Sequence, residues 1–220
     1  MAAKAVSVIT NLITIPLTLH YLGSEQYGVW VAITSIFLIL GVADFGIGNG
    51  LLNMIAFANG RDDPESVRKH ISTAFCLFSI IGLSIALIAF AASPFVSFRS
   101  LLNITAADPG NEIDRAALTL FILFAINLPF TTVLRLQEGL QEGFNNYIIQ
   151  IAGNVLSLIL IVLTIKLEQG LPALVFSLLA GPFFATFLNF CLQFGALKKW
   201  ARPSFASIDK SSAKTLLSSG

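Results

Sequence analysis

Residues 71–98 read ISTAFCLFSIIGLSIALIAFAASPFVSF, an apolar stretch without a charged side chain. A helix needs about 20 such residues to cross the roughly 30 Å hydrocarbon core of a bilayer. Further stretches that meet or approach this length lie at residues 5–22, 28–57, 116–136, 148–165 and 171–197. The sequence therefore predicts an all-α, polytopic membrane protein with about six transmembrane helices.

The composition agrees with this prediction. Hydrophobic residues make up 55% of the chain, charged residues only 11%, and the mean hydropathy is +0.82, whereas about a quarter of the residues in soluble domains are charged. The predicted spans account for most of the chain and leave no room for a soluble catalytic domain. No ATP-binding motif, metal-ligand spacing or activated Ser or Cys arrangement is present in the sequence. We therefore expect no enzyme activity, no cofactor, no bound metal and no nucleic-acid partner.

Lysine and arginine residues are distributed unequally between the two sides of the predicted spans, and this bias predicts orientation. The side opposite the N-terminus carries three of them, Arg99, Arg115 and Lys166. The side of the N-terminus receives Lys4, Arg61, Arg68, Lys69, Arg135, Lys198, Lys199, Arg202, Lys210 and Lys214. Aromatic residues that favour interfaces agree: Tyr21, Tyr27 and Trp30 fall at the outer end, and Tyr147 and Trp200 at the inner ends. Both termini are therefore predicted to be cytoplasmic.

Polar side chains follow one face of the first predicted span. Lys4, Ser7, Asn11, Thr14 and Thr18 fall within about 80° of one another at 100° per residue. A polar group in hydrocarbon costs free energy unless it meets a partner or a water-filled cavity. This face is therefore predicted to form one wall of a pathway through the membrane.

The fourth span carries a similar stripe, formed by Asn127, Thr131, Arg135, Glu138 and Glu142 if the helix continues past the membrane edge. Arg135 and Glu138 are three residues apart and are expected to pair. The planar guanidinium suits phosphate, so Arg135 at the cytoplasmic mouth of a cavity would hold a pyrophosphate head group. In the alternative interpretation, Arg135 extends to the interface and only pairs with Glu138.

The second span is too long for one straight crossing, at about 45 Å. Tilt, a break or extension into the cytoplasm must absorb the excess, and glycine and polar residues crowd between Gly41 and Asn53. Gly46 and Gly50 have the small-xxx-small spacing of helix contacts. Asp44 couples transport to a proton or cation in one interpretation and bonds exposed backbone in the other. Asn49 is a further candidate in this region.

The fifth span has a looser polar stripe, and the sixth is rich in Phe and Leu with a predicted kink at Gly181-Pro182. The polar residues of both spans fit a cavity lining, but polar contacts between helices would also explain much of this pattern. They are Gln150, Gly153, Asn154, Ser157 and Thr164 in the fifth span, and Asn189 and Gln193 in the sixth.

The basic stretch after the sixth span turns apolar again at Leu216-Leu217. We expect residues 1–197 to form a six-helix transmembrane lobe. Residues 198–220 are expected to form a cytoplasmic basic linker toward a seventh helix outside this chain.

The turn Tyr21-Leu22-Gly23-Ser24-Glu25-Gln26-Tyr27-Gly28, followed by Ala43-Asp44-Phe45-Gly46-Ile47-Gly48, resembles the polysaccharide-exporter branch of the multidrug/oligosaccharidyl-lipid/polysaccharide exporter superfamily. The branch contains the bacterial O-antigen and teichoic-acid flippases. The resemblance implies two lobes of about six helices around a central cavity, which move an undecaprenyl-pyrophosphate-linked glycan to the outer leaflet by alternating access. It also implies that the first, second and fourth spans face that cavity, with Lys4 and Arg135 as its cationic residues.

The sequence analysis therefore predicts the N-terminal lobe of a lipid-linked oligosaccharide flippase, used in polysaccharide and lipopolysaccharide assembly, in a bacterial inner membrane. Its expected partners are the lipid-linked glycan, membrane lipids, and a glycan polymerase or glycosyltransferase. A multidrug antiporter of the same superfamily and a non-transporting scaffold for glycan assembly are the alternatives. The candidate substrate-binding residues are Lys4, Asn11, Thr14, Asp44, Asn49, Asn127, Thr131, Arg135 and Glu138.

Overall fold

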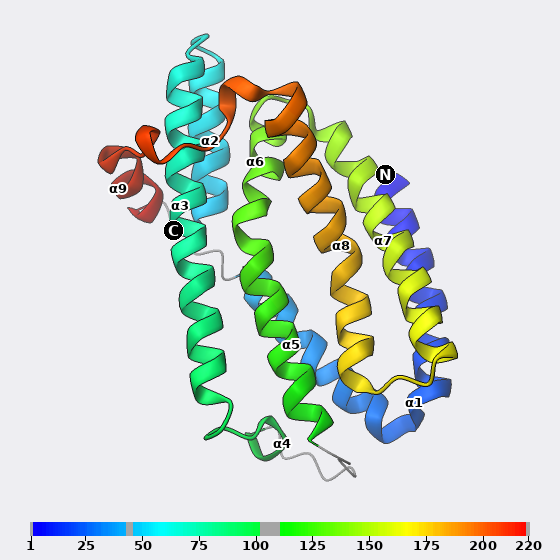
Figure 1. The fold of residues 1–220 in the computed structure, drawn as a ribbon. Coiled ribbons are helices and arrows are strands. Elements are labelled where there is room, and N and C mark those ends of the chain that lie inside the picture. The colour runs from blue at the N-terminus through cyan, green and yellow to red at the C-terminus, as the bar shows by residue number, and fades with distance from the viewer. Residues whose placement is uncertain (1, 43–45, 102–110, 219–220) are drawn as a thin grey trace.

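The computed structural model describes residues 2–42, 46–101 and 111–218, without the side chains of residues 2–7, 9, 11, 38, 41 and 42. All of the regular elements in this part of the chain are helices (Figure 1). They are α1 (Ala2–Val42), α2 (Ile47–Asn59), α3 (Pro64–Ala92), α4 (Phe98–Leu101), α5 (Glu112–Asn127), α6 (Thr132–Gly139), α7 (Gly143–Lys166), α8 (Leu171–Leu192) and α9 (Lys210–Ser218). The prediction of an all-α protein is confirmed.

Four helical segments of the described residues are long and apolar enough to cross a membrane: Pro64–Ala92, Glu112–Gly139, Gly143–Lys166 and Leu171–Leu197. They correspond to the third to sixth predicted spans. The first two predicted spans fall on α1 and α2 and are not among these four segments, so the total of six crossings stays a prediction.

Helix α1 consists of two arms that meet at Gly23. This residue has φ 74° and ψ 169°, a backbone conformation that only glycine adopts without strain, so the helix bends sharply there. The arms follow each other down and back up the fold (Figure 1). The turn predicted between the first two spans is confirmed at this position.

The predicted second span divides into two helices. The second arm of α1 ends at Val42, and α2 begins at Ile47 after Gly46, which has φ 70°. Of the ways in which the excess length could be absorbed, a break between α1 and α2 is the one that the structure contains. Gly46 is the N-cap of α2, and Gly50 donates its backbone N–H to the carbonyl of Gly46 at 2.9 Å.

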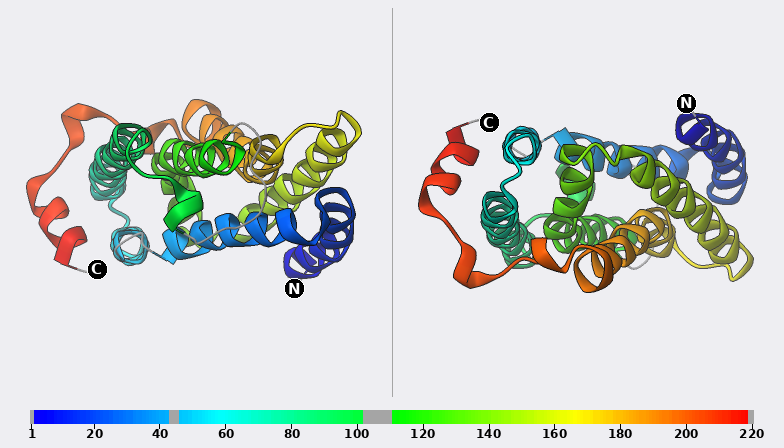
Figure 2. Two further views of the ribbon diagram at one scale, coloured as in Figure 1. Left: turned by 90° about the horizontal axis from the view of Figure 1, so that it is seen from below. Right: turned by 90° about the horizontal axis from the view of Figure 1, so that it is seen from above.

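Seen along the helix axes, the second arm of α1 and α2 lie on one side of the fold, and α3, α5 and α8 lie on the other (Figure 2). Helix α7 and the first arm of α1 close one end of this arrangement. Helices α7 and α8 pack along their length, and α7 also packs against α1. Residues from both sides line the two cavities described below.

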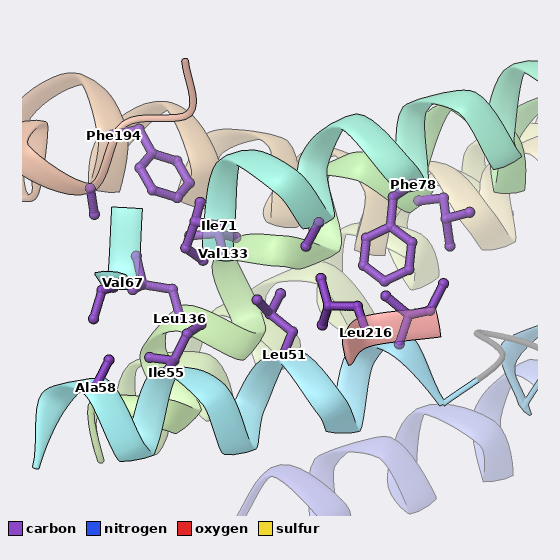
Figure 3. Close-up of a cluster of buried hydrophobic side chains, with 14 of the residues drawn as sticks. Leu51, Ile55, Ala58, Val67, Ile71, Phe78, Val133, Leu136, Phe194 and Leu216 are labelled. Carbon is purple, nitrogen blue, oxygen red and sulfur yellow. The ribbon is translucent and has the colours of Figure 1, made fainter. Parts of the chain in front are cut away.

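One cluster of buried apolar side chains joins α2, α3 and α6 to the C-terminal segment (Figure 3). Leu51, Ile55, Ile71, Leu136 and Leu216 are all fully buried in it. Leu216 comes from α9, which lies against the outer side of α2 and α3 (Figure 1). The segment expected to be a linker thus contributes to the apolar core.

Hydrogen bonds also attach the C-terminal segment to α3. The backbone N–H of Ser204 donates to Ser72 Oγ at 3.1 Å, and that of Asp209 donates to Thr73 Oγ1 at 3.0 Å. The Asp209 carboxylate accepts from Ser211 Oγ and from the N–H and Oγ of Ser212. These bonds stabilise the charged form and hold the pKa of Asp209 well below its usual range. Asp209 therefore stays ionised at neutral pH and anchors the start of α9.

We expect Leu216→Ala to release α9 from α2 and α3. Truncating a fully buried leucine typically costs about 2–5 kcal/mol, which the few hydrogen bonds of this short segment cannot offset. Limited trypsin digestion of the detergent-purified full-length protein should then cleave the two lysines of α9 faster than in wild type. The adjacent Leu217 is 60% exposed, so Leu217→Ala is the matched control. Equal cleavage rates for the two variants would contradict the role of Leu216.

Candidate functional site

A cavity of about 320 Å³ lies between α1, α2, α3, α5, α6 and α7. We call it the Arg135 cavity because Arg135 and Glu138 are the charged residues in its lining. The lining comprises Phe37, Leu40, Gly48, Phe78, Phe124, Asn127, Leu128, Thr131, Leu134, Arg135, Glu138 and Gln150. Polar groups from α5, α6, α7 and the short turn between α5 and α6 thus meet an otherwise apolar surface.

A short 3-10 helix, Leu128–Thr131, positions the polar face of this cavity. It joins α5 to α6, and Pro129 at its start has no N–H to continue the α-helical hydrogen bonds. Thr131 Oγ1 donates to the carbonyl of Leu128 at 2.6 Å, which satisfies one backbone group of this turn. The two helices continue one path, so Asn127, Thr131 and Arg135 remain on the same face as predicted.

Arg135 and Glu138 form the predicted ion pair. Arg135 donates from Nη1 to Glu138 Oε2 at 3.0 Å, and each side chain keeps about a third of its surface accessible, 30% and 33%. Arg135 therefore pairs with Glu138, which both interpretations expected. It also lines the cavity, which the phosphate-binding interpretation requires. A guanidinium has five N–H donors in a planar fork, which is the geometry that binds phosphate oxygens.

The continuation of the stripe to Glu142 is wrong. Helix α6 ends at Gly139, and Gln141 has φ 62°, so the chain turns before Glu142. The Glu142 carboxylate accepts instead from Lys198 Nζ, and this ion pair joins the start of α7 to the segment after α8. The stripe of the fourth span therefore ends at Glu138.

A second cavity of about 430 Å³ lies between the two arms of α1 and helices α7 and α8. We call it the Trp30 cavity. Its polar groups are hydroxyls, one amide and one indole, and none carries a formal charge. The lining comprises Thr10, Thr14, Trp30, Thr34, Phe37, Asn154, Ser157, Ile161, Leu178, Leu179 and Pro182. Phe37 lines both cavities, so the two lie next to each other.

The polar stripe of the predicted fifth span is divided between this cavity and contacts with α8. Ser157 Oγ donates to the carbonyl of Leu178 at 2.7 Å, and the hydroxyls of Thr164 and Ser177 share a hydrogen bond of 2.6 Å. Gly153 packs against the backbone of Pro182. Both interpretations of the stripe therefore apply: Asn154 lines the cavity, Thr164 contacts α8, and Ser157 does both.

The structure brings Asn127, Thr131, Arg135 and Glu138 together in the Arg135 cavity, and it places Thr14, buried at 4% exposure, in the Trp30 cavity. The Asn49 side chain is exposed on α2 and does not line either cavity, although its neighbour Gly48 does. The side chains of Lys4 and Asn11, and all of Asp44, lie outside the described residues.

Gln150 and Trp30 are two of the lining residues that were not chosen as candidates. The sequence placed Gln150 in the polar stripe of the fifth span, but nothing in the sequence indicated that this stripe lies beside Arg135. Trp30 was predicted to lie at the outer end of its span, and its side chain is 7% exposed and lines the Trp30 cavity. A tryptophan near the end of a span gives the same sequence pattern whether its side chain contacts the membrane interface or is buried in the protein.

Among the residues that the structure describes, no three His, Cys, Asp or Glu side chains gather in a way that could hold a metal ion. The two cavities offer one cationic group with its carboxylate partner, beside a neutral hydroxyl and amide surface.

Solved transporter structures share this fold. A MOP superfamily transporter from Pyrococcus furiosus Vc1 (DSM3638) superposes with a TM-score of 0.81 at 17% identity, over 98% of this chain and 47% of that one. A multidrug resistance MATE family transporter of the MOP superfamily in an outward-facing conformation, and a MATE transporter in complex with MaL6, each superpose with a TM-score of 0.79 at 18% identity. Both alignments cover 98% of this chain and 48% of the other. The chain thus spans about half the length of these transporters and has the fold of one of their halves.

A comparison with curated proteins found no match. The family model described as "Polysaccharide biosynthesis protein" matches residues 1–220. This chain, a multi-pass membrane protein with half of a MOP-type transporter fold, therefore belongs to the polysaccharide biosynthesis protein family.

Proposed function

We propose that this chain forms one lobe of an exporter that moves a lipid-linked oligosaccharide across a bacterial inner membrane by alternating access. The observation that carries the proposal is the Arg135 cavity. It places an accessible guanidinium, oriented by Glu138, among the amides of Asn127 and Gln150 inside a membrane protein of a polysaccharide biosynthesis family. An ionisable residue at such a place is a functional candidate by default.

The chemistry of this cavity fits a polyprenyl pyrophosphate head group. Arginine binds phosphate oxygens with two parallel N–H donors and keeps its charge at every physiological pH. Glu138 holds the guanidinium in place and competes with the incoming anion, so that binding stays reversible, as transport requires. Asn127 and Gln150 add neutral donors and acceptors beside the charged pair. An undecaprenyl pyrophosphate would present its phosphates here, with its glycan extending into the lobe.

A second function is supported by the fold itself, since two of the similar solved structures are MATE transporters, one of them described as a multidrug resistance transporter. A cation antiporter of that kind needs acidic residues to bind its substrate and coupling ion. Residues 1–22, the region of the first predicted span, contain Lys4 and no Asp or Glu. This favours an anionic substrate, and the antiporter is the alternative against which the proposal is tested.

We expect Arg135→Ala to lower glycan export by about tenfold or more. Hydrogen bonds to charged groups contribute roughly 1.5–3 kcal/mol, and about 1.4 kcal/mol corresponds to a factor of ten. The measurement is surface glycan in a flippase-null strain that expresses the full-length gene. Asp44→Asn is assayed alongside, because coupling to a proton or cation predicts that it also loses export.

The control for Arg135→Ala is Arg115→Ala, which removes an exposed arginine near the opposite end of the same helical path. It should export like wild type. Full rescue by Arg135→Ala would refute the role of Arg135. If wild type confers resistance to cationic drugs and restores no glycan, the antiporter replaces the proposal. If wild type does neither but still recruits glycan enzymes, the scaffold function replaces the proposal.

A further inference from the structure

The Trp30 cavity differs in chemistry from the Arg135 cavity beside it. Its polar lining consists of threonine and serine hydroxyls, the Asn154 amide and the Trp30 indole, with no charged group among them. Its volume of about 430 Å³ falls within the range of small-molecule sites, which is roughly 300–1,000 Å³. An ion or a strongly charged ligand would lose its hydration there without gaining a counter-charge. The cavity therefore suits an uncharged polar ligand.

The indole N–H of Trp30 is a buried donor that needs a partner. The side chain is 7% exposed, and among the described residues no acceptor lies within hydrogen-bond reach of Nε1. Buried tryptophan N–H groups usually have a partner, because leaving such a donor unsatisfied costs free energy. A ligand oxygen in the cavity would supply the acceptor.

The hydroxyls of the cavity, in contrast, can still accept hydrogen bonds. Thr34 Oγ1 donates to the backbone carbonyl of Trp30 at 2.8 Å, and Ser157 Oγ donates to that of Leu178 at 2.7 Å. Each hydroxyl has thus committed its single hydrogen but keeps lone pairs that accept. Asn154 offers one acceptor and two donors. A ligand with several hydroxyl groups, each both donor and acceptor, matches this set.

Phe37 adds an aromatic ring to the lining of the Trp30 cavity. Phe37 belongs to both cavities, and its ring stands edge-on to Phe124 with centroids 6.0 Å apart. The C–H face of a pyranose ring is apolar and packs against such rings, while its hydroxyls point to polar groups. Because the two cavities adjoin at Phe37, a single ligand with an anionic end and a neutral end would reach both.

We propose that the Trp30 cavity is a subsite for an uncharged sugar unit of the transported molecule, with the phosphates bound at Arg135. This proposal rests on the proposed function and extends it, because the lobe would bind the glycan as well as the head group. The Trp30 N–H donates to a sugar oxygen, and Asn154 and the hydroxyls of α1 and α7 bind the remaining hydroxyl groups.

The test measures two probes separately on the purified full-length protein by isothermal titration calorimetry. One is the reducing oligosaccharide released by mild acid from the lipid-linked glycan of the host strain, and the other is inorganic pyrophosphate. We expect Trp30→Phe and Asn154→Leu each to weaken oligosaccharide binding by about five- to tenfold and to leave pyrophosphate binding unchanged. Arg135→Ala should show the reverse. Trp200→Phe, which changes an exposed tryptophan outside the cavity, is the control and should match wild type.

Melting temperature separates a binding defect from a folding defect. Trp30→Phe keeps an aromatic ring and removes a donor that has no partner among the described residues, which offsets part of the cost of the smaller ring, so the ligand-free variant should melt close to wild type. If Trp30→Phe and Asn154→Leu both bind the oligosaccharide like wild type, the sugar subsite is refuted while the role of Arg135 stands. If wild type binds neither probe and exports no glycan, the proposed function fails with it.

Discussion

Gly181→Ala is expected to separate α7 from α8 and to cause a large loss of stability. A Cβ at Gly181 would lie 2.3 Å from the carbonyl oxygen of Gly153, 2.3 Å from Ser157 Oγ and 2.6 Å from Ser157 N. Two of these atoms are backbone and cannot rotate away. The helices must move apart, which also breaks the bond from Ser157 to the carbonyl of Leu178.

The expected cost is about 1–3 kcal/mol for overpacking and about 1 kcal/mol for the lost hydrogen bond. Thermal denaturation of the full-length protein in detergent, followed by size-exclusion chromatography, measures it. Gly195→Ala is the matched control, because a Cβ at Gly195 meets nothing within 4 Å. A melting temperature for Gly181→Ala equal to that of Gly195→Ala would show that this helix contact yields easily.

The second large effect concerns a buried amide pair that joins α6 to α8. Asn189 Nδ2 donates to Gln137 Oε1 at 2.8 Å, and Gln137 Nε2 donates to Asn189 Oδ1 at 3.2 Å. Gln137 is fully buried and Asn189 is 2% exposed. We expect Gln137→Met and Asn189→Leu each to be strongly destabilising, because either change leaves the other amide buried without its partner, at about 1–3 kcal/mol.

The double variant Gln137→Met/Asn189→Leu should recover most of this loss, since replacing both partners by apolar groups of similar shape removes the unsatisfied groups. The double-mutant cycle should give a coupling energy of about 1–2 kcal/mol, at the upper end of values for hydrogen bonds between membrane helices. Additive losses in melting temperature would mean that the two amides act independently. Thr119→Ala is the control. Thr119 is a partly buried residue of α5 that donates to a carbonyl of its own helix, so this variant measures the stability lost when a polar group outside the pair is removed.

Local properties of the sequence predicted much of the fold. Hydropathy alone located the third to sixth helices, because a long apolar run satisfies its own backbone in lipid only as a helix. Gly23 marked the turn in α1, and the spacing of Arg135 and Glu138 predicted their ion pair, because residues three apart on a helix are neighbours. Each of these features depends on residues close together in the chain.

What a polar residue faces was decided by contacts between distant parts of the chain. The stripes on α5, α6 and α7 are alike in sequence, yet Ser157 and Thr164 bond to α8, Gln137 pairs with Asn189, and Asn127 and Gln150 line the Arg135 cavity. The periodicity of one helix reveals that it has a polar face but does not identify the helix that covers this face. Only the packed structure assigns each group a partner or a cavity.

The sequence by itself determined that this is a helical membrane protein with polar faces on several helices and a cationic group near the end of one span, because hydropathy and helical periodicity are local. The tertiary structure decided that Trp30 is buried beside a neutral cavity, that Arg135 shares its cavity with Gln150, and that α9 packs against α2 and α3. Each of these depends on which helices meet, and that is set by the close fit of surfaces such as Gly153 on Gly181, which no single segment contains.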